Sequence, residues 1–166
     1  MNRKNTNIAI LLAIIVIAVF VTLGFFGLNS FMVTPSVPLS EDVLKEIQDT
    51  GTVSELHVVD VVEGTGDPVA AGDTVAVHYT GLLPDGTIFD ASQDHGGPIS
   101  FTVGAGVVIQ GWERGLIGMK EGGRRILVIP PSLGYGATGV GPIPPNATLI
   151  FDLELAQRTP AEEPAE

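Results

Sequence analysis

The stretch VVIQGW, residues 107–112, joins an apolar run to the start of a short helical pattern and holds the only tryptophan of the chain. From there the sequence predicts a helix face, because apolar or small residues recur at i, i+3, i+4 and i+7. These residues are Trp112, Gly115, Leu116 and Met119. Gly111 before this face and Gly118 and Gly122 after it are expected to delimit the helix. The two-turn helix would present its indole either as core filler or as the floor of an apolar pocket.

Period-two alternation on both sides of this helix predicts strands. They are expected at residues 55–62, 74–80, 87–91, 99–103, 124–130 and 148–156. The segment LPDG at residues 83–86 is a turn signal, since proline presets one dihedral angle and glycine permits the left-handed one. Residues 131–147, rich in proline and glycine, indicate a long structured loop. Antiparallel strands and one short helix bury their apolar surface together only if the sheet wraps the helix. The predicted class is therefore α+β, an antiparallel β-sheet curled around one short α-helix.

A run of 21 residues without a charge, residues 8–28, is long enough to span a bilayer. Arg3 and Lys4 precede it, so the positive-inside rule places residues 1–7 in the cytoplasm and the bulk of the chain outside. We therefore expect a single transmembrane helix in the cytoplasmic membrane, with a periplasmic or other extracytoplasmic domain. The alternative is secretion after cleavage of a signal peptide, whose apolar region would be shorter, about 7–15 residues.

The remaining chain divides into a linker, a domain and a tail. Residues 29–51 read as a linker that contains a brief helix, capped by Ser40 and closed by Gly51, with Leu44 and Ile47 on one side. Its expected role is a spacer that lifts the domain off the bilayer. Residues 52–158 form the predicted domain, and residues 159–166, TPAEEPAE, form a solvated, disordered tail.

Composition and charge exclude several classes of function. Cysteine is absent, which excludes disulfides and thiol nucleophiles. The formal net charge is −11, and because Arg3 and Lys4 contribute +2, residues 31–166 carry −13. This charge disfavours a nucleic-acid partner and favours a monomer whose surface repels its own copies. The three histidines have no metal-ligand spacing, so we expect surface histidines, no metal site and no cofactor.

Aromatic residues come from nearly every predicted element of the domain. Between residues 52 and 158 they are Tyr79, Phe89, Phe101, Trp112, Tyr135 and Phe151. The alternation points Tyr79, Phe101 and Phe151 inward, and the helix face presents Trp112. Aliphatic residues alone could fill a core of this size. The distribution of the rings therefore suggests a lined apolar cavity with two phenol groups at its edge.

Three long motifs carry a resemblance to a known family. They are VHYTGLLPDGTIFDAS at residues 77–92, VVIQGWERGLIGMKEGGRRILVIPPSLGYG at residues 107–136 and PPNATLIFDLEL at residues 144–155. Together they resemble the FKBP family of peptidyl-prolyl cis–trans isomerases, and the similarity runs from about residue 54 to residue 157. The resemblance implies the family fold, with an active site between the sheet and its helix.

The resemblance also implies site residues. The catalytic set is Asp90, Tyr135, Tyr79 and Ile109, and the substrate-binding set is Phe89, Phe101, Val108, Trp112, Ile143 and Phe151. Trp112 would form the floor beneath the prolyl ring. The Ile109 backbone N–H and the Tyr135 hydroxyl would hold peptide carbonyls. Asp90 would accept a hydrogen bond from the Tyr79 hydroxyl or interact with the twisted amide.

The implied reaction needs neither a nucleophile nor a metal. Rotation about an X–Pro bond meets a barrier of about 18–20 kcal/mol, which is lost amide resonance. The planar amide is the more polar form, so a dry aromatic cavity favours the twisted one. The expected partners are proline-containing unfolded or nascent polypeptides, the membrane through residues 8–28, and macrolide inhibitors, because the family includes receptors for macrolide immunosuppressants. The alternative is a non-catalytic peptide-binding or holdase module that uses the same groove.

Overall fold

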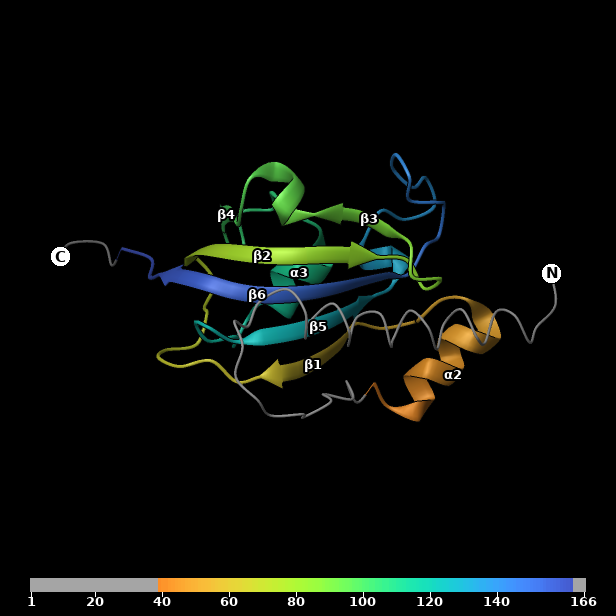
Figure 1. Ribbon diagram of the computed structural model, residues 1–166, viewed down its shortest axis with the longest axis horizontal. Helices are drawn as coiled ribbons and strands as arrows, with labels where there is room; N and C mark the ends of the chain where they lie inside the picture. Colours follow the sequence, from red (N-terminus) through yellow and green to blue (C-terminus); the bar gives the residue numbers. More distant parts are fainter. Residues whose placement is uncertain (1–38, 163–166) are drawn as a thin grey trace, which may run out of the picture.

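The computed structural model describes residues 39–162, which form one curved antiparallel sheet with helices on its two faces (Figure 1). The strands are β1 (His57–Val62), β2 (Thr74–Leu82), β3 (Ile88–Ala91), β4 (Ile99–Thr102), β5 (Arg124–Ile129) and β6 (Leu149–Thr159). The helices are α2 (Glu41–Thr50), α3 (Gln110–Gly115) and the 3₁₀ turns η1 (Ser92–His95) and η2 (Pro131–Leu133). The sheet order is β1-β5-β6-β2-β3, and β4 pairs with β2.

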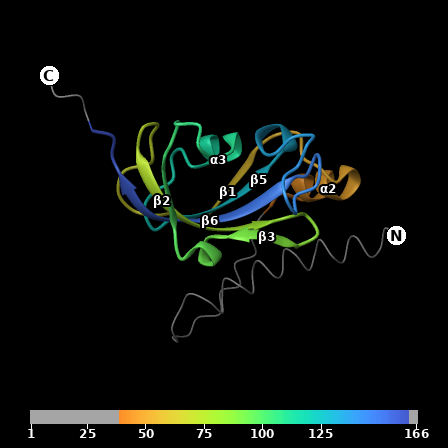
Figure 2. The ribbon, with the colours of Figure 1, turned by 90° about the horizontal axis from the view of Figure 1, so that it is seen from above.

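The concave face of the sheet wraps α3, as the sequence predicts (Figure 2). Every second residue of the central strands points into this core, including Val75, Val77 and Tyr79 of β2. On β6 the inward residues are Leu149, Phe151, Leu153 and Leu155, all of which are buried. The predicted α+β class and the predicted strand faces are therefore confirmed.

Helix α3 begins and ends earlier than the sequence pattern suggests. It spans Gln110–Gly115, so Gly111 lies inside the helix and does not delimit it. The reason is a close approach to β5. A Cβ atom at Gly111 would lie 2.5 Å from Cγ2 of Ile129, and one at Gly115 would lie 2.7 Å from Cδ2 of Leu127. Both glycines therefore let the helix backbone sit directly on the strand.

We expect Gly115→Ala to lower the free energy of unfolding by about 1–3 kcal/mol, because the added methyl group overpacks the contact with Leu127. In an exposed helix the same change would raise stability by up to about 1 kcal/mol. Urea unfolding followed by circular dichroism measures the difference. Gln110→Ala, at an exposed position of the same helix, is the matched control and should change stability by less than about 0.5 kcal/mol. A stabilised Gly115→Ala variant would contradict the close approach.

A buried arginine fixes the end of α3 to the sheet. Nη1 of Arg125, in β5, donates to the carbonyl oxygens of Gly115 at 2.6 Å and Ile117 at 3.0 Å. Nε of the same side chain donates to Oδ1 of Asp60, in β1, at 2.6 Å. The guanidinium thus satisfies carbonyls that the helix end leaves unpaired. Because α3 carries Trp112, this contact also fixes the position of the indole.

Helix α2 is the brief helix expected near residue 40, and it belongs to the folded unit. The Ser40 hydroxyl accepts from the Val43 N–H at 3.5 Å, and Gly51 ends the helix with φ of 77°. Val43 and Ile47 are buried in a second apolar cluster, to which the convex face of the sheet contributes. That cluster comprises Leu39, Val43, Ile47, Val53, Leu82, Ile126, Val128 and Ile150. The expectation of a detached spacer is therefore wrong for residues 39–51.

The boundary of the predicted tail is also wrong. Strand β6 continues to Thr159, which pairs with Thr74, and the Ala161 N–H donates to Oδ1 of Asp73 at 3.0 Å. The chain is therefore held to the domain through residue 161. The predicted transmembrane helix, residues 8–28, and the last four residues lie outside the described range. Within residues 39–162, no helix has the length and apolar character needed to cross a membrane.

Candidate functional site

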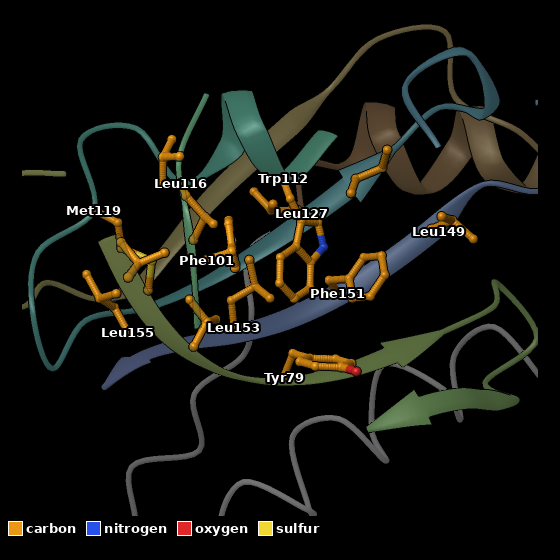
Figure 3. Packing of buried hydrophobic residues seen from close by; sticks show 14 of the residues in the cluster. Tyr79, Phe101, Trp112, Leu116, Met119, Leu127, Leu149, Phe151, Leu153 and Leu155 are labelled. Atoms are coloured by element: carbon orange, nitrogen blue, oxygen red, sulfur yellow. The ribbon is translucent and has the colours of Figure 1, made fainter. Parts of the chain in front are cut away.

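Five aromatic side chains from five elements pack together between the sheet and α3, and we call them the ring cluster. They are Tyr79 of β2, Phe89 of β3, Phe101 of β4, Trp112 of α3 and Phe151 of β6. Figure 3 shows four of them, Tyr79, Phe101, Trp112 and Phe151. The Trp112 centroid lies 5.1 Å from Tyr79, 5.2 Å from Phe151 and 5.9 Å from Phe101. The Phe89 ring contacts the cluster through Phe151, and their ring centroids lie 5.4 Å apart. Most of these contacts are edge-to-face, the arrangement that ring quadrupoles favour.

Trp112 occupies the centre of the ring cluster and is 4% exposed. Its Nε1 atom is buried and has no hydrogen-bond partner within residues 39–162. The indole instead meets Phe151 edge-on, with an interplanar angle of 87°. A buried N–H surrounded by aromatic rings indicates a water-poor environment, because bulk water does not reach it.

Gly81 is a site residue that the sequence reasoning missed. Its position in β2 faces the ring cluster, and a Cβ atom there would lie 2.6 Å from Cζ of Phe89 and 2.9 Å from Cε1 of Phe151. The two rings occupy the space that any side chain would take. A glycine inside an otherwise alternating strand is a recognised sign of such close approach and could have identified it.

The Asp90 carboxylate lies at the edge of the ring cluster and is bound from two sides. The Tyr79 hydroxyl donates to Oδ2 at 2.7 Å, as expected. His95 Nε2 lies 2.7 Å from Oδ1. The sequence analysis treated His95 as a surface residue only. It is exposed, but it also pairs with the Asp90 carboxylate. No sequence signal beyond its place in the loop after Asp90 indicates this pairing.

The pKa values of Asp90, Tyr79 and Tyr135 depend on one another. Partial burial raises the pKa of Asp90, but hydrogen bonds from Tyr79 and His95 outweigh it and lower the pKa below its usual value. Burial, followed by the hydrogen bond to Asp90, raises the pKa of Tyr79 above its usual value. Burial and the Asp90 charge likewise raise the pKa of Tyr135. Tyr135, from the loop after η2, therefore lies within electrostatic reach of Asp90.

Tyr135 and Ile143 occupy different positions in the long loop. Tyr135 is 36% exposed, and its hydroxyl makes no hydrogen bond within residues 39–162. Ile143 is buried in the same core as the ring cluster. Val140, which forms a bridge with Ile143, is the exposed apolar residue of this loop, at 58%. The loop therefore offers a free phenol and an exposed valine next to a buried isoleucine.

A carboxylate from α3 braces the loop that precedes the helix. Glu113 accepts hydrogen bonds from the backbone N–H groups of Gly104 and Gly106, the second at 2.8 Å. Val108 and Ile109 follow in this loop, half-buried against the core. The Ile109 carbonyl accepts from the Trp112 N–H at 3.0 Å, whereas the Ile109 N–H has no acceptor within residues 39–162. That N–H is thus available to a bound carbonyl.

The arrangement offers apolar rings, a fixed carboxylate and free hydrogen-bond donors, without a metal site. No group of three or more histidine, aspartate or glutamate side chains in residues 39–162 could hold a metal ion. Such a site can bind an apolar ring and hold the flanking peptide. The sequence profile of the family described as "FKBP-type peptidyl-prolyl cis-trans isomerase" matches residues 66–156, more than half of the chain.

The chain belongs to the FKBP-type peptidyl-prolyl cis-trans isomerases. It is therefore an FKBP-type enzyme that catalyses rotation about peptidyl-prolyl bonds. This FKBP domain is 51% identical over 104 residues to an FK506-binding protein of Neisseria meningitidis serogroup A, covering 62% of this chain and 95% of that one. It is 58% identical over 85 residues to FK506-binding protein 2 of Yarrowia lipolytica, covering 51% and 59%.

Several solved structures are similar to this FKBP domain, including those of AtFKBP13 and FkpA. The crystal structure of AtFKBP13 aligns with a TM-score of 0.61 at 38% identity, covering 65% of this chain and 96% of that one. The crystal structure of FkpA from Escherichia coli aligns with a TM-score of 0.62 at 43% identity, covering 74% and 58%. Sequence and structure therefore agree on the family.

Proposed function

We propose that the ring cluster and its edge form the prolyl-binding site of this isomerase. The observation that carries this proposal is the packing of three aromatic rings, Tyr79, Phe101 and Phe151, around Trp112, next to a carboxylate held by Tyr79. Trp112 supports the proline ring, and the half-buried Val108 adds an apolar wall. A water-poor surface of this kind disfavours the polar planar amide and so lowers the rotation barrier.

The free donors at the edge hold the peptide on either side of the proline. The Ile109 N–H and the Tyr135 hydroxyl each bind a peptide carbonyl, since neither has a partner within residues 39–162. Asp90 contributes its charge beside the amide and orients Tyr79. Phe89, Phe101 and Phe151 line the sides, while the buried Ile143 supports the loop from below.

Tyr135→Phe should lower kcat/KM about two- to tenfold, the effect of losing one hydrogen bond to the bound peptide. The measurement is isomerisation of an X–Pro peptide series by the full chain in mild detergent, followed by magnetisation exchange. Gln48→Ala, at an exposed position of α2, is the control and should leave the rate unchanged. If Tyr135→Phe also leaves the rate unchanged in every peptide, the hydroxyl does not bind substrate.

A second candidate function is holding unfolded chains without isomerising them. The side chains of Val107 and Val140 are 67% and 58% exposed, and they favour it because they add exposed apolar surface to the two loops that carry Ile109 and Ile143. The two functions separate experimentally. Tyr135→Phe should slow isomerisation but leave suppression of aggregation intact, whereas a double replacement of Val107 and Val140 by serine should do the reverse.

We further propose that the substrates are unfolded or newly exported proteins met outside the cytoplasmic membrane. The uncharged run at residues 8–28, preceded by Arg3 and Lys4, supports this placement. Release of the protein from membranes by high salt would contradict an anchor.

Macrolide binding is proposed as well, since the similar proteins from Neisseria and Yarrowia are named for binding FK506. Titration of the Trp112 fluorescence with FK506 tests it.

A further inference from the structure

The two oxygens of the Asp90 carboxylate have different side-chain partners. Oδ2 accepts from the Tyr79 hydroxyl and Oδ1 pairs with His95 Nε2, each at 2.7 Å. The side chains of His95 and Asp90 are 55% and 40% exposed, so the pair lies at the surface of the site and is accessible to protons. No lysine or arginine within residues 39–162 pairs with Asp90. The charge balance at this carboxylate therefore depends on His95.

The backbone fixes His95 in this position. It is the last residue of η1, and the turn closes through hydrogen bonds from the Gly96 N–H to the Gln93 carbonyl and from the Gly97 N–H to the Ser92 carbonyl. The Ser92 hydroxyl, in a residue only 1% exposed, accepts from the Tyr79 N–H at 3.1 Å. The turn that carries His95 is thus attached to the strand that carries Tyr79. The histidine is presented to Asp90 by the fold.

Histidine is the side chain that changes charge between pH 5 and 8. When neutral, His95 must keep its proton on Nε2 to donate to Asp90, and the carboxylate charge is then unbalanced. When protonated, it forms a charge-assisted hydrogen bond, which is roughly twice as strong as a neutral one. Asp90 stays ionised across this range, because its pKa lies below the usual aspartate value.

The other titratable groups around the pair come from the elements that pack against η1. They are His78 and Tyr79 of β2, Asp94 of η1 itself and Tyr135 of the long loop. The pKa values of both tyrosines are raised, so both phenols stay neutral below pH 8. Asp94 adds a second carboxylate, and His78 adds a second imidazole. The experiment must therefore separate the two histidines.

We propose that His95 is a positioning residue of the isomerase, which holds Asp90 against Tyr79 and, when protonated, raises kcat/KM. This rests on the proposed role of Asp90 in the prolyl site. A carboxylate without a positive charge next to it stays hydrated. An incoming peptide must displace this water from beside the ring cluster, which costs free energy. The protonated imidazole balances that charge and lowers the cost. Since exposed ion pairs contribute modestly, the expected change is about two- to fivefold.

The test is the pH dependence of kcat/KM between pH 5.5 and 8.0 for the full chain and two variants. The substrate is an X–Pro peptide without titratable side chains, followed by magnetisation exchange so that no second enzyme limits the range. We expect the unmodified protein to lose two- to fivefold in kcat/KM as the pH rises. His95→Gln should be flat at the lower level, because its amide donates without a charge. His95→Arg should be flat at the higher level, because its charge is permanent.

Two control variants and a second readout make the outcome specific. Asp94→Asn should keep the pH step, and so should His78→Gln. A flat profile in the unmodified protein, or a step that survives in His95→Gln, would overturn the proposal. Independently, the NMR signals of Tyr79 should shift with the His95 ring as it titrates, and should not shift in His95→Gln. This readout does not depend on turnover. An inactive protein would refute the proposed prolyl site, whereas Tyr79 signals that do not respond to His95 would refute the coupling of His95 to Asp90.

Discussion

Asp73→Ala is expected to lower the free energy of unfolding by about 2–4 kcal/mol, the largest stability effect that the structure indicates. Asp73 is 3% exposed and joins three parts of the chain. Its carboxylate accepts from the Ala70 N–H at 2.8 Å, from Nε of Arg158 at 2.6 Å and from the Ala161 N–H at 3.0 Å. Removing it leaves a largely buried guanidinium and two N–H groups without their acceptor. Urea unfolding of the full chain measures the loss.

Asp67 provides the matched control. Its carboxylate lies 3.8 Å from Nη1 of the same Arg158, but its side chain is 89% exposed. Exposed pairs of this kind contribute less than about 1 kcal/mol, so Asp67→Ala should be close to neutral. If the two variants lose the same stability, the buried carboxylate has no special role.

The Asp73 carboxylate also makes the stability of the protein depend on pH. The hydrogen bond from Ala70, together with those from Arg158 and Ala161, holds the pKa of Asp73 below its usual value, although burial acts in the opposite direction. The native protein therefore binds fewer protons than the unfolded chain near the unfolded pKa of about 3.9. Asp73 contributes its full stabilisation above that pH and loses it as the pH falls through the lower, folded value. Asp73→Ala should consequently show a smaller acid destabilisation than the unmodified protein.

Gly81→Ala should lower kcat/KM by about tenfold or more, the largest activity effect we expect, because a small misplacement in a site can cost up to about 100-fold. The new methyl group would overlap the Phe89 ring, whose Cζ atom lies 2.6 Å from the Cβ position. Phe89 is half-buried and can swing outward, which would remove one wall of the ring cluster. Isomerisation of X–Pro peptides by the full chain is the measurement.

The control for Gly81 is Thr80→Ala in the same strand. Thr80 is half-buried and points away from the ring cluster, on the face opposite Tyr79. It should keep the rate of the unmodified protein, while near-UV circular dichroism shows whether the aromatic packing of Gly81→Ala has changed. An unchanged rate together with unchanged aromatic packing in Gly81→Ala would show that the site tolerates a side chain there.

Periodicity predicted much of the fold. The alternation in β2 and β6 identified their inward faces, and the helical spacing identified Trp112, Leu116 and Met119 as buried. These features depend on the local geometry of strands and helices, which repeats along the chain whatever lies beside it. The resemblance then supplied a list of site residues, of which Tyr79, Phe89, Phe101, Trp112 and Phe151 come together in the structure.

The sequence could not place partners that lie far apart along the chain. The sequence pattern predicts a helix boundary at Gly111, but the contact that requires a glycine there is made by Ile129. The helix at residues 41–50 was recognised, but not the sheet face that covers it. The sequence predicts only a surface residue at His95, but a turn anchored by Ser92 brings its side chain to Asp90.

By itself, then, the sequence determined which residues form strands and helices, which of their faces are apolar, and to which family the long motifs point. Only the tertiary structure decided how closely α3 approaches β5, which carboxylate binds Arg158, and which imidazole balances Asp90. The physical reason is that period and propensity act over a few residues. Steric fit and charge pairing depend instead on distances between segments that only the folded chain brings together.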